Sequence, residues 1–293
     1  MKAGKDYGLV FSPERFNPGD TERSMSKIAK LVGAIDKEWA ETAKNLYSNV
    51  FDNVHIVKDI KTAEASKVIE NIQRDLNIAL MNELAMIFEK MNIDIMDVIN
   101  AASTKWNFVK YTPGCGVGGH CLPVDPYYLT EKAKQLGYNA KVIAAGREIN
   151  DHMPLHTVEI AVKAINSAGL NIKNSKITVL GLTYKGNVYD TRGSPALSII
   201  KELTEYCKNV YVHDPLANGN DVNGLNVKFA DFDEAIKNSD CIILVTDHDQ
   251  FKKLDFNSIK NKVRTPIIID GRNIFDLNKL REMGFICKGI GRP

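Results

Sequence analysis

The sequence predicts an α/β protein that ends in a doubly wound, Rossmann-like domain. After Gly169, short apolar runs alternate with amphipathic stretches, which is the pattern of parallel strands joined by crossover helices. Before that point, residues 62–91 keep helical apolar spacing with no Pro or Gly and predict one helix about 45 Å long. A chain of 293 residues is long enough for roughly two domains.

The charge balance excludes several classes of protein. The chain has 38 Lys and Arg against 36 Asp and Glu, and no stretch gathers the like charges of a nucleic-acid-binding arm. We therefore expect no nucleic-acid partner. No apolar run approaches the roughly 18 residues of a membrane span, and residues 1–6 are not a signal peptide. These features predict a cytoplasmic protein with no membrane partner.

The five cysteines form an odd and scattered set, which argues against a disulfide framework. Cys115, His120 and Cys121 lie close together, but no second ligand pair follows at the spacing of a zinc finger. We therefore expect no metal site, and a single reactive cysteine remains open.

The N-terminal region predicts part of a domain. A strand at residues 8–12 runs directly into the loop 13–19, and a second apolar run follows at residues 28–32. A helix capped by Asp36 should extend to about residue 50, before a third strand at residues 54–57. Because nothing precedes the first strand, we expect the chain to begin inside a domain.

The central region predicts helices around a glycine- and proline-rich loop. Beyond the long helix, helical patterns are expected at residues 94–102, 126–136 and 140–167, with the loop at residues 106–124.

The C-terminal region predicts a parallel sheet whose strand ends bind a ligand. The expected strands are residues 177–180, 210–213, 241–245 and 267–270, with helices at residues 195–206 and 232–237. The loops at the carboxyl ends of these strands are residues 181–186, 214–215, 246–247 and 271–272. Within the first of these loops, Lys185 is the candidate phosphate ligand, although the glycine triplet and P-loop residues are missing.

Gly114, Gly116 and Gly119 satisfy the G-x-G-x-x-G dinucleotide pattern in form only. That pattern needs a preceding strand and a helix that opens inside it, whereas Pro113 precedes and Pro123 follows closely. The glycines favour instead a backbone that approaches a ligand closely.

Cys121 lies in the segment richest in reactive groups, residues 118–125, with Asp125 four residues further on. Two interpretations stay open, a nucleophile and a buried inert thiol, and composition alone favours the second. A cysteine hydrolase pairing Cys121 with His120 is disfavoured, because adjacent loop side chains seldom face each other.

Lys67 and Asn71 lie four residues apart on the predicted long helix and therefore share a face. Such a pair can hold a developing oxyanion, but spacing alone favours an ordinary solvated helix surface.

Five segments occur in one order: residues 12–19, residues 63–67 with Asn71 and Asn82-Glu83, residues 118–125, residues 181–195 and residues 270–273. In that order they resemble the UDP-glucose/GDP-mannose dehydrogenase family, and within it the UDP-N-acetyl-D-mannosamine and UDP-N-acetylglucosamine 6-dehydrogenase branch. The resemblance covers essentially the whole chain and makes Cys121, Lys67 and Asn71 the leading candidates for catalysis.

The resemblance implies an NAD-dependent four-electron oxidation of a sugar C6 alcohol to a carboxylate, with a role in polysaccharide biosynthesis. Cys121 would form the thiohemiacetal and thioester, Lys67 and Asn71 would stabilise oxyanions, Asp125 would order the attacking water, and Glu14 would assist. The substrate-binding residues implied are Arg15, Phe16, Tyr111, Gly116, Gly118, Gly119, Lys185 and Arg192, and Arg272 would reach a nucleotide of the cofactor. The partners implied are a UDP-N-acetyl-hexosamine and a second copy of the chain, packed through the long helix.

Departures from the family pattern refine these expectations. Pro18 and Val124 stand where UDP-glucose enzymes carry charged residues, which favours a 2-acetamido substrate. No residue reports which epimer is bound. The family's N-terminal strand, glycine-rich turn and helix for NAD are not present, so we expect a fragment without activity of its own. Its domains would be an NAD-domain remnant (1–60), a central helical and catalytic region (61–168) and a UDP-binding domain (169–293); a non-catalytic UDP-sugar-binding module is the alternative.

Overall fold

The computed structural model describes residues 1–17, 19 and 24–293, and the chain forms two compact units, Met1–Gln73 and Arg74–Pro293. Each unit contains a sheet of its own. The boundary falls within the long helix α2 (Ile60–Met91), whose 32 residues correspond to about 48 Å. The predicted long helix is therefore confirmed.

The first unit is built on a small mixed sheet in the order β1-β2-β3. Strand β2 (Lys30–Ala34) pairs antiparallel with β1 (Val10–Phe11) and parallel with β3 (Val54–Ile56). Helix α1 (Lys37–Tyr47) joins β2 to β3 and begins at Asp36, whose side chain accepts a hydrogen bond from the N–H of Trp39, as the capping pattern predicted. A short 3₁₀ turn, η1 (Met25–Lys27), precedes β2.

The second unit begins at Arg74, within α2, and continues through further helices before its sheet. These are α3 (Ile95–Ala102), α4 (Asp125–Gln135) and α5 (Lys141–Ser167). The irregular segment between α3 and α4 contains the glycines and Cys121. All three helices agree with the predicted ranges.

The sheet of the second unit has six parallel strands in the order β6-β5-β4-β7-β8-β9. Their bounds are β4 (Ile177–Leu180), β5 (Val210–His213), β6 (Lys228–Phe229), β7 (Cys241–Leu244), β8 (Ile267–Asp270) and β9 (Ile286–Gly289). The chain moves outward from β4 to β6 and then returns to β7 on the other side of β4. The crevice between the ends of β4 and β7 is thus the switch point at which such sheets bind ligands.

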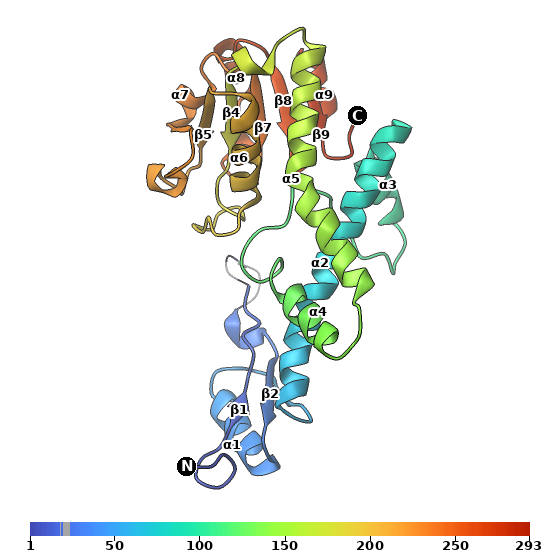
Figure 1. Cartoon of the computed structure of the whole chain (residues 1–293), viewed down its shortest axis with the longest axis vertical. Helices are drawn as coiled ribbons and strands as arrows, with labels where there is room; N and C mark the ends of the chain where they lie inside the picture. The colour runs from blue at the N-terminus through green and yellow to red at the C-terminus, as the bar shows by residue number, and fades with distance from the viewer. Residues whose placement is uncertain (18, 20–23) are drawn as a thin grey trace. The chain divides into compact units, whose positions relative to one another are not determined.

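Helices cover both faces of this sheet, which confirms the doubly wound fold (Figure 1). One buried cluster joins α5 and α6 (Pro195–Tyr206) to alternate strand residues such as Val179 and Ile243. The opposite cluster joins the other strand face to α7 (Phe232–Ile236), α8 (Phe256–Lys262) and α9 (Leu277–Glu282). The remaining short turns are η2 (Ile172–Asn174), η3 (Gly219–Val222) and η4 (Phe251–Lys253).

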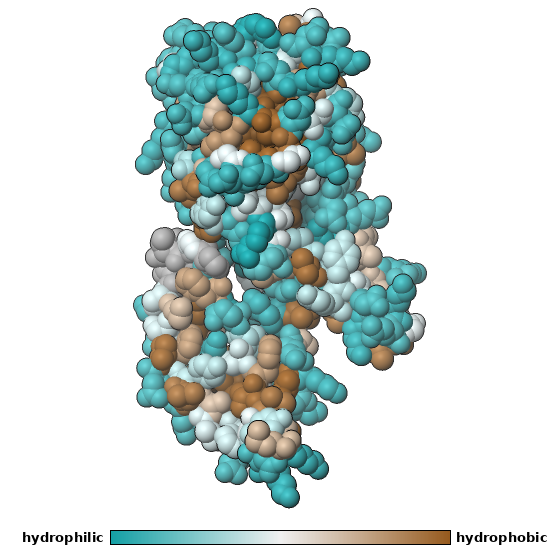
Figure 2. All heavy atoms as spheres, turned by 60° about the vertical axis from the view of Figure 1, so that its left-hand side comes forward, coloured by the Kyte–Doolittle hydropathy of each residue, from teal (hydrophilic) through white to brown (hydrophobic). Residues whose placement is uncertain are grey.

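On the visible surface, hydrophobic residues form separate patches among hydrophilic ones (Figure 2). Among the described residues, no helix combines the length and apolar character needed to cross a bilayer.

Candidate active site

Cys121 lies just before the first turn of α4. Its carbonyl oxygen accepts hydrogen bonds from the N–H groups of Val124 (3.1 Å) and Asp125 (2.8 Å), so the thiol is carried at the amino end of an 11-residue helix. The side chain is half-buried and forms no disulfide.

The other four cysteines, Cys115, Cys207, Cys241 and Cys287, are buried. Burial raises the pKa of the Cys115 thiol, which packs against the backbone and reaches the carbonyl oxygen of Val245 at 3.5 Å. All five cysteines lie in the described part of the chain, so Cys121 differs from the rest in its access to solvent.

Iodoacetamide should therefore alkylate Cys121 first in the folded chain, because a buried thiol with a raised pKa is seldom a thiolate and seldom exposed. Peptide mass spectrometry of a time course checks this expectation. Labelling of Cys115 at the same rate as Cys121 would contradict it, and labelling in denaturant, where all five thiols should react, is the control.

The glycines before Cys121 permit a close approach to the segment that follows β4. A Cβ on Gly118 would lie 2.7 Å from Pro195 Cδ, and one on Gly119 would lie 3.1 Å from the ring of Tyr184. Gly116 and Gly119 also have φ values of +124° and +90°, which disfavour other residues. The close approach expected from the sequence is therefore made to the protein itself, while a contact with the sugar stays a prediction.

The same segment crosses the carboxyl ends of β7 and β8. The N–H of Cys115 donates to the carbonyl oxygen of Gly271 at 2.9 Å. Arg272 donates from Nε to the carbonyl oxygen of Val245 (2.6 Å) and from its guanidinium to that of Gly116 (3.2 Å). Arg272, predicted to reach the cofactor, thus holds the loop against the sheet in this structure.

Lys185 and Arg192 lie in the segment that leads from β4 to α6. Lys185 is half-buried, whereas the exposed guanidinium of Arg192 pairs with both oxygens of Asp190, at 2.9 and 2.7 Å. This hydrogen bonding, more than partial burial, sets the pKa of Asp190, which lies below its usual value. Both cations belong to the loop at the switch point, where the sequence placed the phosphate ligand.

Tyr184 is a neighbour of Cys121 that the sequence pattern missed. Burial raises the pKa of its hydroxyl, and the charges of Asp190 and Cys121 act in the same direction. Its backbone N–H donates to the carbonyl oxygen of Asp190 at 2.9 Å. The tyrosine therefore joins the glycine segment to the loop after β4.

Asp214, at the end of β5, is the centre of a buried network. Its Oδ2 accepts hydrogen bonds from the N–H groups of Leu182 (2.6 Å) and Thr183 (3.0 Å). Its Oδ1 accepts from those of Leu216 (2.8 Å) and Ala217 (3.0 Å). The carboxylate thereby joins the loops that follow β4 and β5.

His248 adds the loop after β7 to this network. Its Nδ1 accepts from the N–H of Asn187 at 3.0 Å, which assigns the proton to Nε2, and Nε2 lies 3.0 Å from Asp214 Oδ2. Burial would raise the pKa of Asp214, but the hydrogen bonds from His248, Leu182 and Thr183 outweigh it and hold that pKa far below its usual value. No sequence motif singled out His248.

Neither the glycine pattern 114–119 nor the end of β5 forms a Rossmann-type site for a dinucleotide. The first glycine of the 114–119 pattern follows no strand, and α4 opens only beyond its last glycine. In a dinucleotide site, an acidic residue near the end of the second strand binds the ribose. Asp214 occupies that position here, but both of its carboxylate oxygens accept hydrogen bonds from the protein backbone.

The remaining predicted residues of the second unit are Tyr111 and Asp125. Tyr111 is partly buried and packs against the main hydrophobic cluster. Asp125 is half-buried and is the first residue of α4.

The first unit contains the other predicted residues. On α2, Asn71 is buried and Lys67 is half-buried. The exposed Glu14 carboxylate accepts from the N–H groups of Phe16 (2.7 Å) and Arg15 (2.8 Å) and lies 3.3 Å from Lys30 Nζ. Partial burial would raise the pKa of Glu14, but these partners hold it below its usual value.

Arg15 is occupied within the same unit, where it pairs with Glu70 at 2.8 Å and donates to the carbonyl oxygen of Ala29 at 2.7 Å. Pro18 lies outside the described residues. The joining of Lys67, Asn71 and Glu14 with Cys121 in one site stays a prediction.

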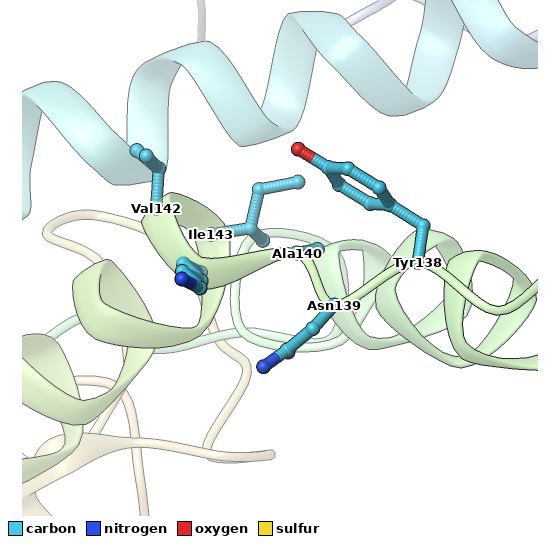
Figure 3. A pocket seen from close by; sticks show the side chains of 6 residues that line it. Tyr138, Asn139, Ala140, Val142 and Ile143 are labelled. Atoms are coloured by element: carbon cyan, nitrogen blue, oxygen red, sulfur yellow. The ribbon is translucent and has the colours of Figure 1, made fainter.

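Two other features of the described residues lie outside this site. Among the described residues, no group of three or more His, Cys, Asp or Glu side chains is arranged to hold a metal ion. A surface hollow occurs at residues 138–143, where Tyr138, Val142 and Ile143 lie on one side of the connection between α4 and α5 and Asn139 on the other (Figure 3). Its lining provides a single charged side chain, Lys141.

Comparison with known families decides the relationship. Residues 61–152 match the central domain of the UDP-glucose/GDP-mannose dehydrogenase family, and residues 178–277 match the UDP binding domain of the same family. The chain belongs to this family. The resemblance predicted from the five segments is confirmed.

Several curated proteins are similar to this chain. Protein CapL of Staphylococcus aureus is 42% identical over 288 residues, and the UDP-N-acetyl-D-glucosamine 6-dehydrogenase of Pseudomonas aeruginosa is 40% identical over 284 residues. These alignments cover 96% and 95% of this chain but 66% of each relative. The chain thus spans just under two thirds of the length of these relatives.

A solved structure supports the fold. The structure of a UDP-D-ManNAc dehydrogenase from Pyrococcus horikoshii superimposes with a TM-score of 0.88 at 34% identity, over 100% of this chain and 66% of that one. The α/β fold with parallel strands and a long helix is therefore that of the family.

Proposed function

We propose that this chain provides the reactive thiol and the UDP-sugar-binding domain of an NAD-dependent UDP-N-acetyl-D-mannosamine 6-dehydrogenase. The observation that carries the proposal is the position of Cys121. It is a half-exposed thiol at the amino end of α4, on a loop that packs against the ligand-binding edge of the family's UDP binding domain. Similar proteins named UDP-N-acetyl-D-mannosamine dehydrogenase support the choice of sugar.

The family uses NAD, which accepts a hydride in each oxidation when bound. The chemistry of this chain begins once C6 is an aldehyde. The Cys121 thiolate adds to the carbonyl carbon, and the carbonyl oxygen becomes an oxyanion that takes up a proton. At the thioester stage water adds to the same carbon, the C–S bond breaks, and the carboxylate product and the thiolate are released.

The other predicted residues have roles that suit these steps. Lys67 and Asn71 stabilise the oxyanion on the C6 oxygen through an ammonium and an amide, and Glu14 assists near that oxygen. Asp125 orders the attacking water or accepts its proton. Each of these assignments follows from the family resemblance and from the residue's chemistry.

Lys185 and Arg192 are the proposed ligands of the UDP diphosphate. Arg192 already binds a carboxylate through two nitrogen atoms, and the same planar geometry suits a phosphate group. The glycine segment would then face the sugar. Arg272 would bind the cofactor only if its guanidinium gave up its hydrogen bonds to the carbonyl oxygens of Val245 and Gly116 and donated to the cofactor instead.

Substrate discrimination tests the assignment to this branch. In a form of the protein active with NAD, kcat/KM for UDP-N-acetylmannosamine should exceed that for UDP-glucose by more than about tenfold, because a buried acetamido methyl adds apolar contact and a bare hydroxyl leaves pocket donors unpaired. The expected preference rests on Pro18 and Val124, and of these two the structure describes Val124, which is 38% exposed at the start of α4. Equal or better turnover of UDP-glucose would exclude the branch.

Two alternatives have specific support. UDP-N-acetylglucosamine is favoured by the names of two similar dehydrogenases, and inclusion of that sugar in the same comparison decides between the epimers. A non-catalytic UDP-sugar-binding module is favoured by the absence of a dinucleotide fingerprint in the described residues. Calorimetry of this chain, titrated with UDP-sugar and separately with NAD, measures which of the two ligands it binds. We expect heat of binding from the UDP-sugar and none from NAD.

A homodimer through α2 is also proposed. Leu80 and Ile87, seven residues apart and therefore on one face of the helix, are 49% and 45% exposed. Replacing both with Glu should yield monomers in sedimentation, because charges would enter an apolar contact. Tyr206→Glu, at an exposed position on α6, is the control and should leave the dimer intact. A monomeric unsubstituted chain at micromolar concentration would exclude the proposal.

Location in the cytoplasm and a role in polysaccharide biosynthesis stay predictions from the sequence.

A further inference from the structure

Both ends of the segment that bears Cys121 are tied to one polar network between α2 and α5. At the beginning of the segment, the N–H of Gly114 donates to Asn82 Oδ1 at 2.9 Å. At its end, the Tyr127 hydroxyl donates to Asp151 Oδ2 at 3.1 Å. Cys121 lies between these two anchors along the chain.

The two anchors are connected through buried side chains. Asn82 Nδ2 donates to Asn150 Oδ1 at 2.8 Å, and Asn150 Nδ2 donates to Asp75 Oδ1 at 2.8 Å. The Arg147 guanidinium donates to the same Asp75 oxygen at 2.5 Å and also pairs with Asp151. A continuous path therefore runs from Gly114 to Tyr127 through two helices.

The centre of the network is poorly suited to stabilising the fold. Asp75 and Arg147 are 1% and 2% exposed, and among the described residues Asp75 Oδ2 and Arg147 Nε have no hydrogen-bond partner. Burial raises the pKa of Asp75 despite the opposing charge of Arg147. Because a buried ion pair seldom adds more stability than apolar residues of the same size, a role in specifying geometry explains the network better.

The glycine segment requires such a device. Gly116 and Gly119 give its backbone access to conformations that other residues avoid, so the segment has little stiffness of its own. The position of a thiol on such a segment is set by the contacts that hold the segment, both those with Gly271 and Arg272 and those at its two ends. Asn82 is 0% exposed and holds the first of these ends.

We infer that the network of Asp75, Arg147, Asn150 and Asn82 positions the Cys121 thiol. Asn82 is the member of the network that contacts the loop, through its hydrogen bond from the N–H of Gly114. The inference rests on the proposed role of Cys121 as nucleophile. The four residues are positioning residues, since they act on Cys121 through the backbone of its loop.

The test is the rate at which iodoacetamide alkylates Cys121 in this chain, measured by peptide mass spectrometry at one pH. Asn82→Ala should raise the rate by at least about threefold, as expected when a hydrogen bond that closes the loop is lost. Tyr127→Phe removes only a hydroxyl at the other anchor and does not disturb the core. It should raise the rate by a smaller factor, which keeps the inference testable if Asn82→Ala fails to fold.

A matched control comes from a second buried pair. Asp240, 0% exposed and directly before β7 at the amino ends of the strands, pairs with Arg264. Asp240→Asn should lower the melting temperature but leave the alkylation rate within about twofold of the unsubstituted chain. If folded Asn82→Ala, or Tyr127→Phe in its place, reacts no faster than Asp240→Asn, the network is structural only and the inference is wrong.

Failure of the proposed function gives a different result. If Cys121→Ser still forms the uronate at the unsubstituted rate in a form of the protein active with NAD, Cys121 is not the nucleophile, whatever the alkylation rates. If Cys121→Ser abolishes uronate formation while the alkylation rates of Asn82→Ala and Asp240→Asn agree, the function stands and the positioning inference alone is excluded.

Discussion

Cys121→Ser should reduce formation of the uronate by about 10³-fold or more in a form of the protein active with NAD. A serine hydroxyl is a far weaker nucleophile than a thiolate, and its ester is cleaved less readily than a thioester. The reaction should therefore stall after the first oxidation. Following aldehyde and uronate separately by chromatography measures both stages.

Cys115→Ser is the matched control for this experiment. Cys115 belongs to the same loop as Cys121 but is buried. Its sulfur contacts the backbone carbonyl of Val245, and burial raises its pKa. Serine retains a donor at that position, so activity should fall only a few-fold. Equal losses from the two substitutions would show that neither cysteine has a special role.

Asp214→Asn should lower the free energy of unfolding by about 3 kcal/mol, the cost of leaving buried donors without a charged acceptor. The carboxylate accepts from four backbone N–H groups and from His248, and an amide offers one oxygen in place of two. Denaturant titration at pH 7 measures the loss. Asp249→Asn, an exposed position beside His248, is the control and should change stability little.

The pH dependence provides a second readout of the same interaction. The folded state lowers the pKa of Asp214, so its contribution is fully present above the ordinary carboxyl pKa near 4 and is lost as pH falls toward the folded value. The unsubstituted chain should therefore lose more stability between about pH 5 and pH 3 than Asp214→Asn does. Parallel pH profiles for the two proteins would contradict the assigned ionisation.

Much of the fold could be predicted because its long elements have strong local patterns. The apolar spacing of α2 and the buried runs of β4, β7 and β8 are continuous in the sequence. Strand β6 has two residues, α8 has seven and α9 has six, which is too short for periodicity to appear. Strand β9 is interrupted by Lys288 and ends at a glycine, so it lacked the apolar run that indicated the other strands.

The site could be predicted only where its residues are close in sequence or follow a strand. Cys121 and Lys185 were named as candidates on these grounds, and it was the family resemblance that made Cys121 the leading one. His248 meets Asp214 across 34 residues, and Asn82 meets Gly114 across 32, through contacts that no spacing rule describes. Tyr184 was missed because it packs against the backbone of Gly119, at a distance that a Cβ would not allow. The sequence shows that residue 119 is a glycine but does not show which side chain lies against it.

The burial of four cysteines has a consequence for oxidative stress. Peroxide converts an accessible thiolate to a sulfenic acid, which is normally rescued by a nearby thiol that closes a disulfide. Here Cys115, Cys207, Cys241 and Cys287 are all enclosed in the fold. Among the described residues no second accessible thiol is present to close a disulfide with Cys121, so a sulfenic acid there would have to be reduced by a thiol from outside the chain before a second peroxide oxidised it to the sulfinic acid.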